Sequence, residues 1–252
     1  MPTTLHERRR PLQDDEIAQI PWLPRLQPDE RLRAVQDLRV GMARPGEMIC
    51  RTGRPATYWF GVVQGLLKVS TLTPQGRTTT YTGIAPGGWF GEGTVLKREP
   101  YRYDVQALRK SRVAGLPTAT FHWLLDHSIG FNRFIMDQFN ERLGQFIGTL
   151  AVERTSEPEQ RVAHSLLTLT NPRLFHNVGH ELHITQQELA YLVGLSRQRV
   201  NEALRELARR DLVRADYGRL RILDLAALRR FCFSDRPHAG HDNGGVHVNG
   251  DL

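Results

Sequence analysis

The sequence predicts an α+β fold in which an antiparallel barrel or sandwich of short strands precedes a long helix and a helical C-terminal part. Three observations lead to this prediction. Short apolar runs separated by Gly and Pro occupy residues 44–116, and an apolar stripe at helical spacing follows within residues 118–155. Two capped helices and a hairpin then occupy residues 184–223.

The composition is that of an ordinary globular protein. The 252 residues include 34 Lys+Arg and 27 Asp+Glu, a formal charge of +7, with 40% apolar and 24% charged residues. No run approaches the roughly 20 apolar residues that span a bilayer, and the N-terminus lacks a signal-peptide core. Two cysteines, Cys50 and Cys232, exclude a disulfide scaffold and a four-cysteine metal site within one chain. We therefore expect a cytoplasmic protein with no membrane partner.

Short helices broken by proline and then short strands make up the first half. Residues 1–13 are polar and should be frayed, whereas 14–38 read as short helices interrupted at Pro21, Pro24 and Pro28. The strands are expected at 58–63, 66–72, 78–84, 105–108 and 113–116. The Thr-Pro-Gln-Gly segment at 73–76 predicts a type I hairpin turn, which favours antiparallel pairing.

After Pro117 the period changes to that of a helix, predicted through about residue 155. Its apolar stripe consists of Phe131, Ile135, Phe139, Leu143, Phe146 and Leu150. One interpretation packs this helix on its own barrel. Because it is long for one small domain to cover, we favour a dimerisation helix over about 120–155 with Phe139, Leu143, Phe146 and Leu150 in the seam.

A helix boundary follows at 155–158. Ser156 with Glu159 three residues later has the pattern of a capping box, and Pro158 suits a first helical turn. The sequence thus predicts a sensor part at 14–155, a second domain at 156–232 and a disordered tail at 233–252, with the hinge between the first two.

Residues 184–223 predict a helix-turn-helix followed by a wing. Thr185 and Glu188 form a second capping box, Gly194 suits a helix C-cap, and Ser196 caps a helix at about 197–210. Two apolar strands, 212–215 and 220–223, flank a turn at 216–219.

The exposed face of the second helix predicts DNA binding. Arg197, Gln198 and Asn201 lie in its N-terminal half, where recognition helices read bases, and these side chains match guanine and adenine edges. Backbone contacts are expected from Thr185, Gln186, Ser196, Arg199, Arg205 and Arg219. The alternative interpretation is a merely solvated polar helix face.

Three stretches resemble the cyclic-AMP receptor protein/Fnr (Crp/Fnr) family of bacterial transcription regulators, over roughly residues 15–232. They are 44–70, 87–108 and 184–207, the last being ITQQELAYLVGLSRQRVNEALREL. The resemblance implies an antiparallel β-roll sensor of the cyclic-nucleotide-binding type, a dimerisation helix and a winged helix-turn-helix. It also implies a homodimer that binds double-stranded DNA at a two-fold operator, with RNA polymerase as a candidate further partner.

The resemblance places the effector pocket at Gly91, Glu92, Arg102, Tyr103, Phe146 and Ile147. Family members that bind cyclic AMP carry serine where Tyr103 stands and a Thr-Ser pair where Phe146-Ile147 stands, so a more apolar effector, or none, is expected. Cyclic-nucleotide or haem sensing remains the alternative, as does a structural ion pair between Glu92 and Arg102. No cysteine precedes Cys50, so the iron–sulfur cluster of the oxygen-sensing branch is not expected.

The recognition helix also departs from the family, with Gln198 in place of a glutamate and Glu202 in place of an arginine, so the operator is expected to differ. A cupin-like enzyme and a protein-interaction module are the rival functions. No histidine lies between His6 and His122, which disfavours a metal site in the barrel. His176, His180 and His183 read as a solvated loop, with metal binding as the alternative.

Overall fold

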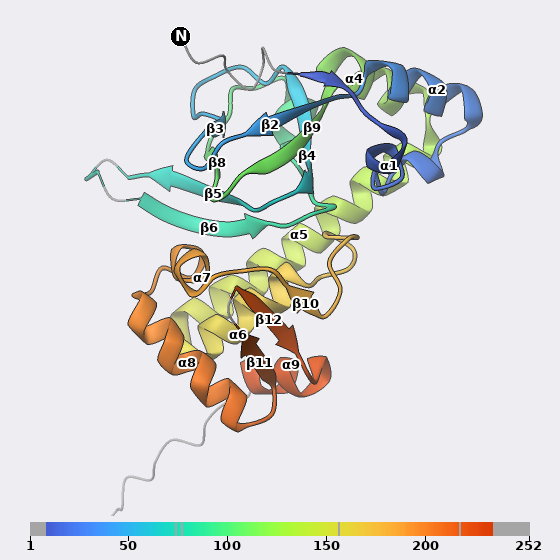
Figure 1. Ribbon diagram of the computed structural model, residues 1–252. Coiled ribbons are helices and arrows are strands. Elements are labelled where there is room, and N and C mark those ends of the chain that lie inside the picture. Colours follow the sequence, from blue (N-terminus) through green and yellow to red (C-terminus); the bar gives the residue numbers. More distant parts are fainter. Residues whose placement is uncertain (1–8, 74, 77, 156, 217, 234–252) are drawn as a thin grey trace, which may run out of the picture.

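The computed structural model describes residues 9–73, 75–76, 78–155, 157–216 and 218–233. A roll of two β-sheets lies at one end, a three-stranded sheet with helices lies at the other, and a long helix, α5, passes between them (Figure 1). We call the strands β1–β9 the roll and residues 157–233 the winged domain. The turn residue Pro74, the boundary residue Ser156 and residues 234–252 of the predicted tail lie outside the described residues. Phe233, the first residue of the predicted tail, is instead the last residue of a helix.

Residues 9–13 are part of the folded N-terminal segment, so the expectation of fraying was wrong for them. Strand β1 (Arg10–Pro11) pairs with β2 (Arg39–Ala43), and α1 (Asp14–Ile17), a 3-10 turn (Leu23–Arg25) and α2 (Pro28–Asp37) follow. Short helices occupy this stretch as predicted, but the prolines do not mark their ends: α1 ends at Ile17, Pro24 lies within the 3-10 turn and Pro28 begins α2. The segment is fixed by burial of Trp22, which is fully covered.

A buried carboxylate secures this segment to the roll. The side chain of Glu16 has no exposed surface and accepts hydrogen bonds from Arg10 (2.8 Å to each oxygen), from Arg112 (3.1 Å) and from the Gln13 backbone N–H (2.9 Å). These donors, Arg10 first, lower the pKa of Glu16 to about 2, against the opposing effect of burial.

Glu16→Gln is expected to lower the free energy of unfolding at pH 7 by about 2 kcal/mol, because it removes charge-assisted hydrogen bonds. The folded-state pKa lies below the ordinary value of 4.5, so the contribution is complete above pH 4.5 and is lost as pH falls toward 2. Urea titrations of both proteins at pH 7 and pH 3 measure it, and the difference should shrink at pH 3. Glu99→Gln breaks an ion pair to the exposed Arg102 and should cost under about 0.5 kcal/mol.

The roll consists of two antiparallel sheets, ordered β1-β2-β9-β4-β7 and β3-β8-β5-β6. All five predicted strands are present. The strands are β3 (Met48–Cys50), β4 (Tyr58–Gln64), β5 (Leu67–Leu72), β6 (Thr78–Ile84), β7 (Trp89–Phe90), β8 (Asp104–Ala107) and β9 (Ser111–Pro117). The strands that were not predicted, β1, β2, β3 and β7, have five residues or fewer. Cys50 is a buried strand residue, as expected.

The helical region after Pro117 is two helices rather than one. Helix α4 (Thr118–His127) ends at Ser128, whose hydroxyl donates to Glu30 (2.7 Å) and accepts from the N–H of Phe131, and α5 (Ile129–Thr155) begins there. The predicted stripe also divides. Phe131 and Ile135 are buried in an aromatic core around Trp22, Trp59 and Trp89, whereas the later apolar residues face outward.

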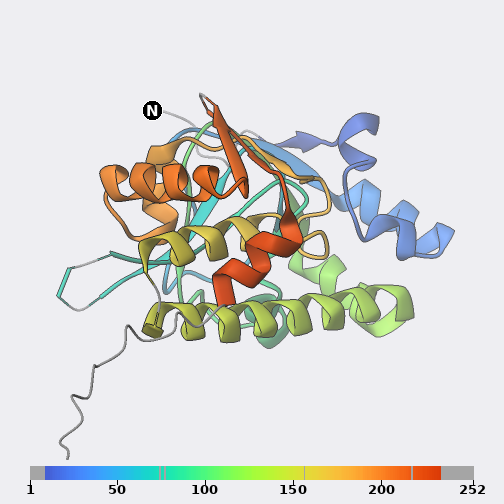
Figure 2. The same cartoon turned by 90° about the horizontal axis from the view of Figure 1, so that it is seen from below.

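The outward residues form a stripe of their own. Met136, Phe139, Leu143, Phe146 and Leu150 are between 38% and 61% exposed and alternate at spacings of three and four. This is the a/d pattern of a coiled-coil seam. Seen from below, α5 lies along the edge of the molecule (Figure 2).

The winged domain begins with α6 (Pro158–Leu169). Its N-cap is Glu157 in a capping box with Gln160, one residue later than the predicted Ser156–Glu159 box. The remaining elements are β10 (Glu181–Leu182), α7 (Gln186–Val193), α8 (Arg197–Arg209), β11 (Val213–Asp216), β12 (Arg219–Ile222) and α9 (Leu225–Phe233). The hairpin β11–β12 is the predicted wing, and β10 and α9 were not foreseen.

Candidate nucleic-acid interface

Helices α7 and α8 form the predicted helix-turn-helix with the predicted caps. The Thr185 hydroxyl accepts from the N–H of Glu188, and the Ser196 hydroxyl accepts from the N–H of Arg199, both at 3.2 Å. Gly194 ends α7 with φ of +69°, a left-handed conformation that favours glycine. These local signals fix where each helix begins and therefore which residues point outward.

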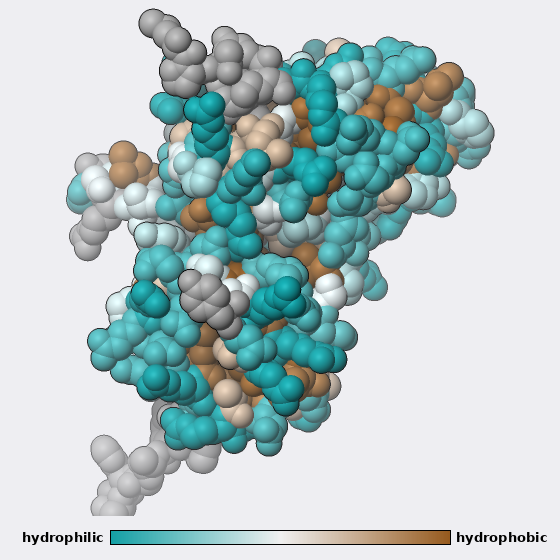
Figure 3. All heavy atoms as spheres, in the orientation of Figure 1, coloured by the Kyte–Doolittle hydropathy of each residue, from teal (hydrophilic) through white to brown (hydrophobic). Residues whose placement is uncertain are grey.

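One face of α8 is buried and the other is exposed to solvent. Val200, Leu204 and Leu207 are buried against α6 and α7. Arg197 and Gln198 are consequently exposed, and Asn201 is half-buried. The surface over α8 is mostly hydrophilic (Figure 3). An exposed face with these donors and acceptors has the chemistry needed to read base edges.

Two hydrogen bonds orient the polar side chains of this face. The Gln186 amide donates to Asn201 Oδ1 (3.2 Å), which leaves the Asn201 amide N–H groups available. The Gln198 amide donates to Glu202 Oε1 (3.1 Å), so the acidic residue at 202 lies within the same polar row.

A hollow between α7, α8 and the wing brings several predicted contact residues together. Its lining includes Thr185, Gln186, Arg197 and Arg219. Arg199 and Arg205 are exposed on α8 but do not line this hollow. Ser196 serves the helix as its cap, and its hydroxyl is already engaged.

The effector segment has a different ion pair from the one considered. Glu92, in α3 (Glu92–Lys97), is 3% exposed and accepts from Nε of Arg142 on α5 at 2.7 Å; Arg142 also donates to the Trp89 carbonyl. Arg102 instead pairs with Glu99 at 2.7 Å, and its side chain is 74% exposed. The Glu92–Arg102 alternative is therefore wrong. Arg142 was missed because only the fold brings residue 142 to residue 92.

Of the remaining effector candidates, Tyr103 lies beside Gly91 in the roll, whereas Phe146 and Ile147 lie on α5. The Tyr103 hydroxyl lies beside Gly91, 3.9 Å from the position that a Cβ would take there. Burial, reinforced by nearby Glu92, raises the pKa of Tyr103 to about 12, so the phenol is neutral at pH 7. Oε2 of Glu92 is buried and has no hydrogen-bond partner among the described residues. Phe146 and Ile147 are 49% and 60% exposed on α5.

No cluster of three or more metal-ligating side chains occurs within the part of the chain that the structure describes. In the loop that carries the three histidines, His183 lies 3.9 Å from Glu181. None of the helices in the described ranges is long and apolar enough to cross a membrane.

Comparison with known proteins gives two family matches. The cyclic nucleotide-binding domain family matches residues 42–128, and the Crp-like helix-turn-helix domain family matches residues 160–231. The transcriptional regulator LdrP of Thermus thermophilus is 32% identical over 187 residues, covering 73% of this chain and 92% of LdrP. A CRP-like cAMP-activated global transcriptional regulator of Mycobacterium tuberculosis is 27% identical over 190 residues, covering 73% and 84% of the two chains.

A solved structure agrees with these matches. The crystal structure of a CRP-family transcriptional regulator from Thermus thermophilus aligns with a TM-score of 0.54 and 27% identity, covering 77% of this chain and 96% of that one. These relatives are transcription regulators and not enzymes, which leaves the cupin-like alternative without support.

Proposed function

The chain belongs to the Crp/Fnr family of transcription regulators, and from that premise we propose that it binds a two-fold DNA operator as a homodimer. The observation that carries the proposal is the open face of α8, whose Arg197, Gln198 and Asn201 stand opposite a fully buried apolar side. Such a helix enters a major groove with its N-terminal residues on the bases. From DNA binding we infer a cytoplasmic location.

Within this interface we assign two roles. Arg197, Gln198 and Asn201 read bases, because their forked or amide groups match guanine and adenine edges. Thr185, Gln186, Ser196, Arg199, Arg205 and Arg219 contact or border the phosphate backbone, which fixes the register of the protein but not the sequence.

The dimer forms through the outward stripe of α5, defined above from Met136 to Leu150. Its heptad spacing and exposure support a parallel two-chain seam. We propose the boundary between the sensor part and the DNA-binding part at 155–158, where α5 ends and α6 begins.

Selection of bound duplexes from a random pool, with purified protein and no added ligand, tests the proposal. We expect a palindrome whose half-sites lie about 34–36 Å apart, one helical turn. Enrichment of a single asymmetric half-site would contradict the dimer. If nothing is enriched, a second selection with cell extract separates an effector-dependent regulator from a chain that does not bind DNA.

For the sensor we propose an effector other than cyclic AMP. The neutral phenol of Tyr103 takes the space beside Gly91, and Phe146 and Ile147 offer no hydrogen-bonding groups. The unpartnered Oε2 of Glu92 favours a small molecule with a hydroxyl or N–H donor and an apolar body.

Cyclic AMP is accordingly expected to produce no heat of binding in titration calorimetry at concentrations up to about 1 mM, because polar edges left unpaired cost about 1–3 kcal/mol each. It should also leave operator affinity unchanged. Micromolar binding, or a change in operator affinity at those concentrations, would return the protein to the cyclic-nucleotide-responsive branch.

A further inference from the structure

An ion pair joins the winged domain to the roll. Arg109 lies in the turn between β8 and β9, and its guanidinium meets the Glu188 carboxylate of α7 along both edges. The distances are 2.8 Å from Nε to Oε1 and 2.8 Å from the terminal nitrogen to Oε2. Among the described residues this is the one ion pair that joins the strands of the roll to the winged domain.

Glu188 is also the residue that organises the N-terminal turn of α7. Its Oε2 accepts from the Thr185 backbone N–H (2.8 Å) and from the Thr185 hydroxyl (2.9 Å). Arg109 therefore holds the carboxylate that caps the helix carrying Thr185 and Gln186. The Glu188 side chain is only 12% exposed and that of Arg109 30%, so water screens the pair little.

Two further contacts join the winged domain to the roll near this ion pair. A Cβ at Gly83 of β6 would lie 2.8 Å from a methyl group of Leu192 of α7 and 2.9 Å from one of Leu169 of α6, so a larger residue there would require these leucine side chains to shift. Next to Leu192, Lys68 of β5 lies 5.7 Å from the ring centre of Tyr191. Helix α7, the first helix of the helix-turn-helix, therefore packs the winged domain against β5 and β6.

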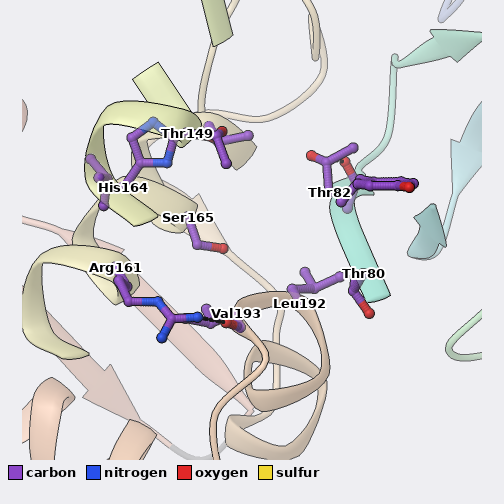
Figure 4. A pocket seen from close by; sticks show the side chains of 12 residues that line it. Thr80, Thr82, Thr149, Arg161, His164, Ser165, Leu192 and Val193 are labelled. Atoms are coloured by element: carbon purple, nitrogen blue, oxygen red, sulfur yellow. Dashed lines mark hydrogen bonds between the residues drawn. The ribbon is translucent and has the colours of Figure 1, made fainter. Parts of the chain in front are cut away.

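Beside this contact lies a small polar cavity, shown in Figure 4. Thr80 and Thr82 of β6 line one side, and Arg161, His164 and Ser165 of α6 line the other. Burial lowers the pKa of His164, which favours its neutral form. Apolar side chains of the roll and the winged domain pack in one buried cluster, which includes Ile84, Phe175 and Leu189 and holds the two parts together. The Arg109–Glu188 pair adds a directional, charged contact at the N-terminal turn of α7.

We infer that Arg109, a residue of the sensor part, is a positioning residue for DNA binding: it sets the orientation of α7 and neutralises Glu188 beside the phosphate-contacting end of that helix. This inference rests on the proposed function. Without Arg109, the Glu188 charge would remain nearly buried close to Thr185 and Gln186, where it would repel the phosphate backbone. The loss of affinity on removing Arg109 should be the same for all DNA sequences, because Arg109 does not contact a side chain that reads bases.

The test compares Arg109→Gln with Lys110→Gln by fluorescence anisotropy on the selected palindrome. Lys110 is the next residue in the same turn and is exposed, so both variants lose one positive charge at nearly the same place. We expect about a tenfold weaker affinity for Arg109→Gln and less than about a twofold change for Lys110→Gln. The dependence of affinity on salt should keep its slope, whereas a lost phosphate contact would lower it by about 1.

A double-mutant cycle with Glu188→Gln identifies the pair. Glutamine also serves the capping box, so Glu188→Gln keeps the helix start while removing the charge. In that background Arg109→Gln should change affinity by less than about twofold. Equal losses in the Arg109 and Lys110 variants, additive effects in the cycle, or tighter binding by Arg109→Gln would overturn the inference.

A measurement without DNA keeps this inference separate from the proposed function. Amide hydrogen exchange at residues 185–189 should be about tenfold faster in Arg109→Gln and unchanged in Lys110→Gln. Unchanged exchange in Arg109→Gln would overturn the positioning role even if the wild-type protein binds its operator. Failure of the wild-type protein to bind any duplex would reject the proposed function instead.

Discussion

Arg197→Ala is expected to weaken binding to the selected palindrome by about 1–3 kcal/mol per half-site, roughly 5- to 150-fold, and to relax the preference at one base position. The reason is geometric. Arg197 is the first residue of α8, is exposed, and borders the hollow that also contains Thr185 and Arg219. Anisotropy titrations against the palindrome and its single-base variants measure the affinity and the relaxed position together.

Arg209→Ala is the matched control, because Arg209 is the last residue of the same helix and its exposed side chain pairs with Glu206 at 2.9 Å. It removes the same charge without reaching the reading face, and should leave the base preference intact. If Arg197→Ala weakens binding to all duplexes equally, Arg197 contacts the DNA backbone, and Gln198 and Asn201 are then the residues that read bases.

The two amides of the reading face have partners that limit what they can read. Asn201 Oδ1 accepts from Gln186, so its free N–H groups face outward as donors. Gln198 is bound to Glu202, an acceptor that suits the amino group of cytosine or adenine but repels phosphate. This pairing explains in physical terms why the operator should differ from that of relatives with other residues at these positions.

Local signals made the helix-turn-helix predictable. Its caps, Thr185, Gly194 and Ser196, interact with residues three or four positions away, so the capping patterns can be recognised in the sequence. Five strands of the roll were predictable from short apolar or alternating runs separated by Gly and Pro. Strands as short as β3 and β7 leave no such periodic pattern, and they form because their neighbours pair with them.

Long-range pairs were not predictable from one sequence. Arg142 meets Glu92 across 50 residues and Arg109 meets Glu188 across 79, and nothing in the spacing singles out these arginines among so many. The sequence also does not show which residues of the apolar stripe of α5 are buried. Helical spacing identified the apolar positions, but only the roll decides that Phe131 and Ile135 are buried while Leu143 and Leu150 face outward.

Phe146→Asp is expected to convert the proposed dimer to a monomer. Phe146 stands near the centre of the outward stripe, 49% exposed in the single chain, and two-fold symmetry places two copies in one seam. Removing about 2 kcal/mol of apolar burial from each chain costs about 4 kcal/mol per dimer, roughly a thousandfold in the dissociation constant, before the two carboxylates repel. Sedimentation equilibrium at micromolar concentration measures the change, and operator affinity should fall with it because one subunit reads one half-site.

Leu32→Asp supplies the control for this prediction. Leu32 is a leucine of α2 that is 61% exposed and lies outside the α5 stripe, so the substitution introduces the same charge on a surface that the dimer does not use. It should leave the mass of the particle and the operator affinity unchanged. A dimer that persists in Phe146→Asp, with the wild-type dissociation constant, would show that the seam lies elsewhere. The outward stripe of α5 would then need another partner to cover it.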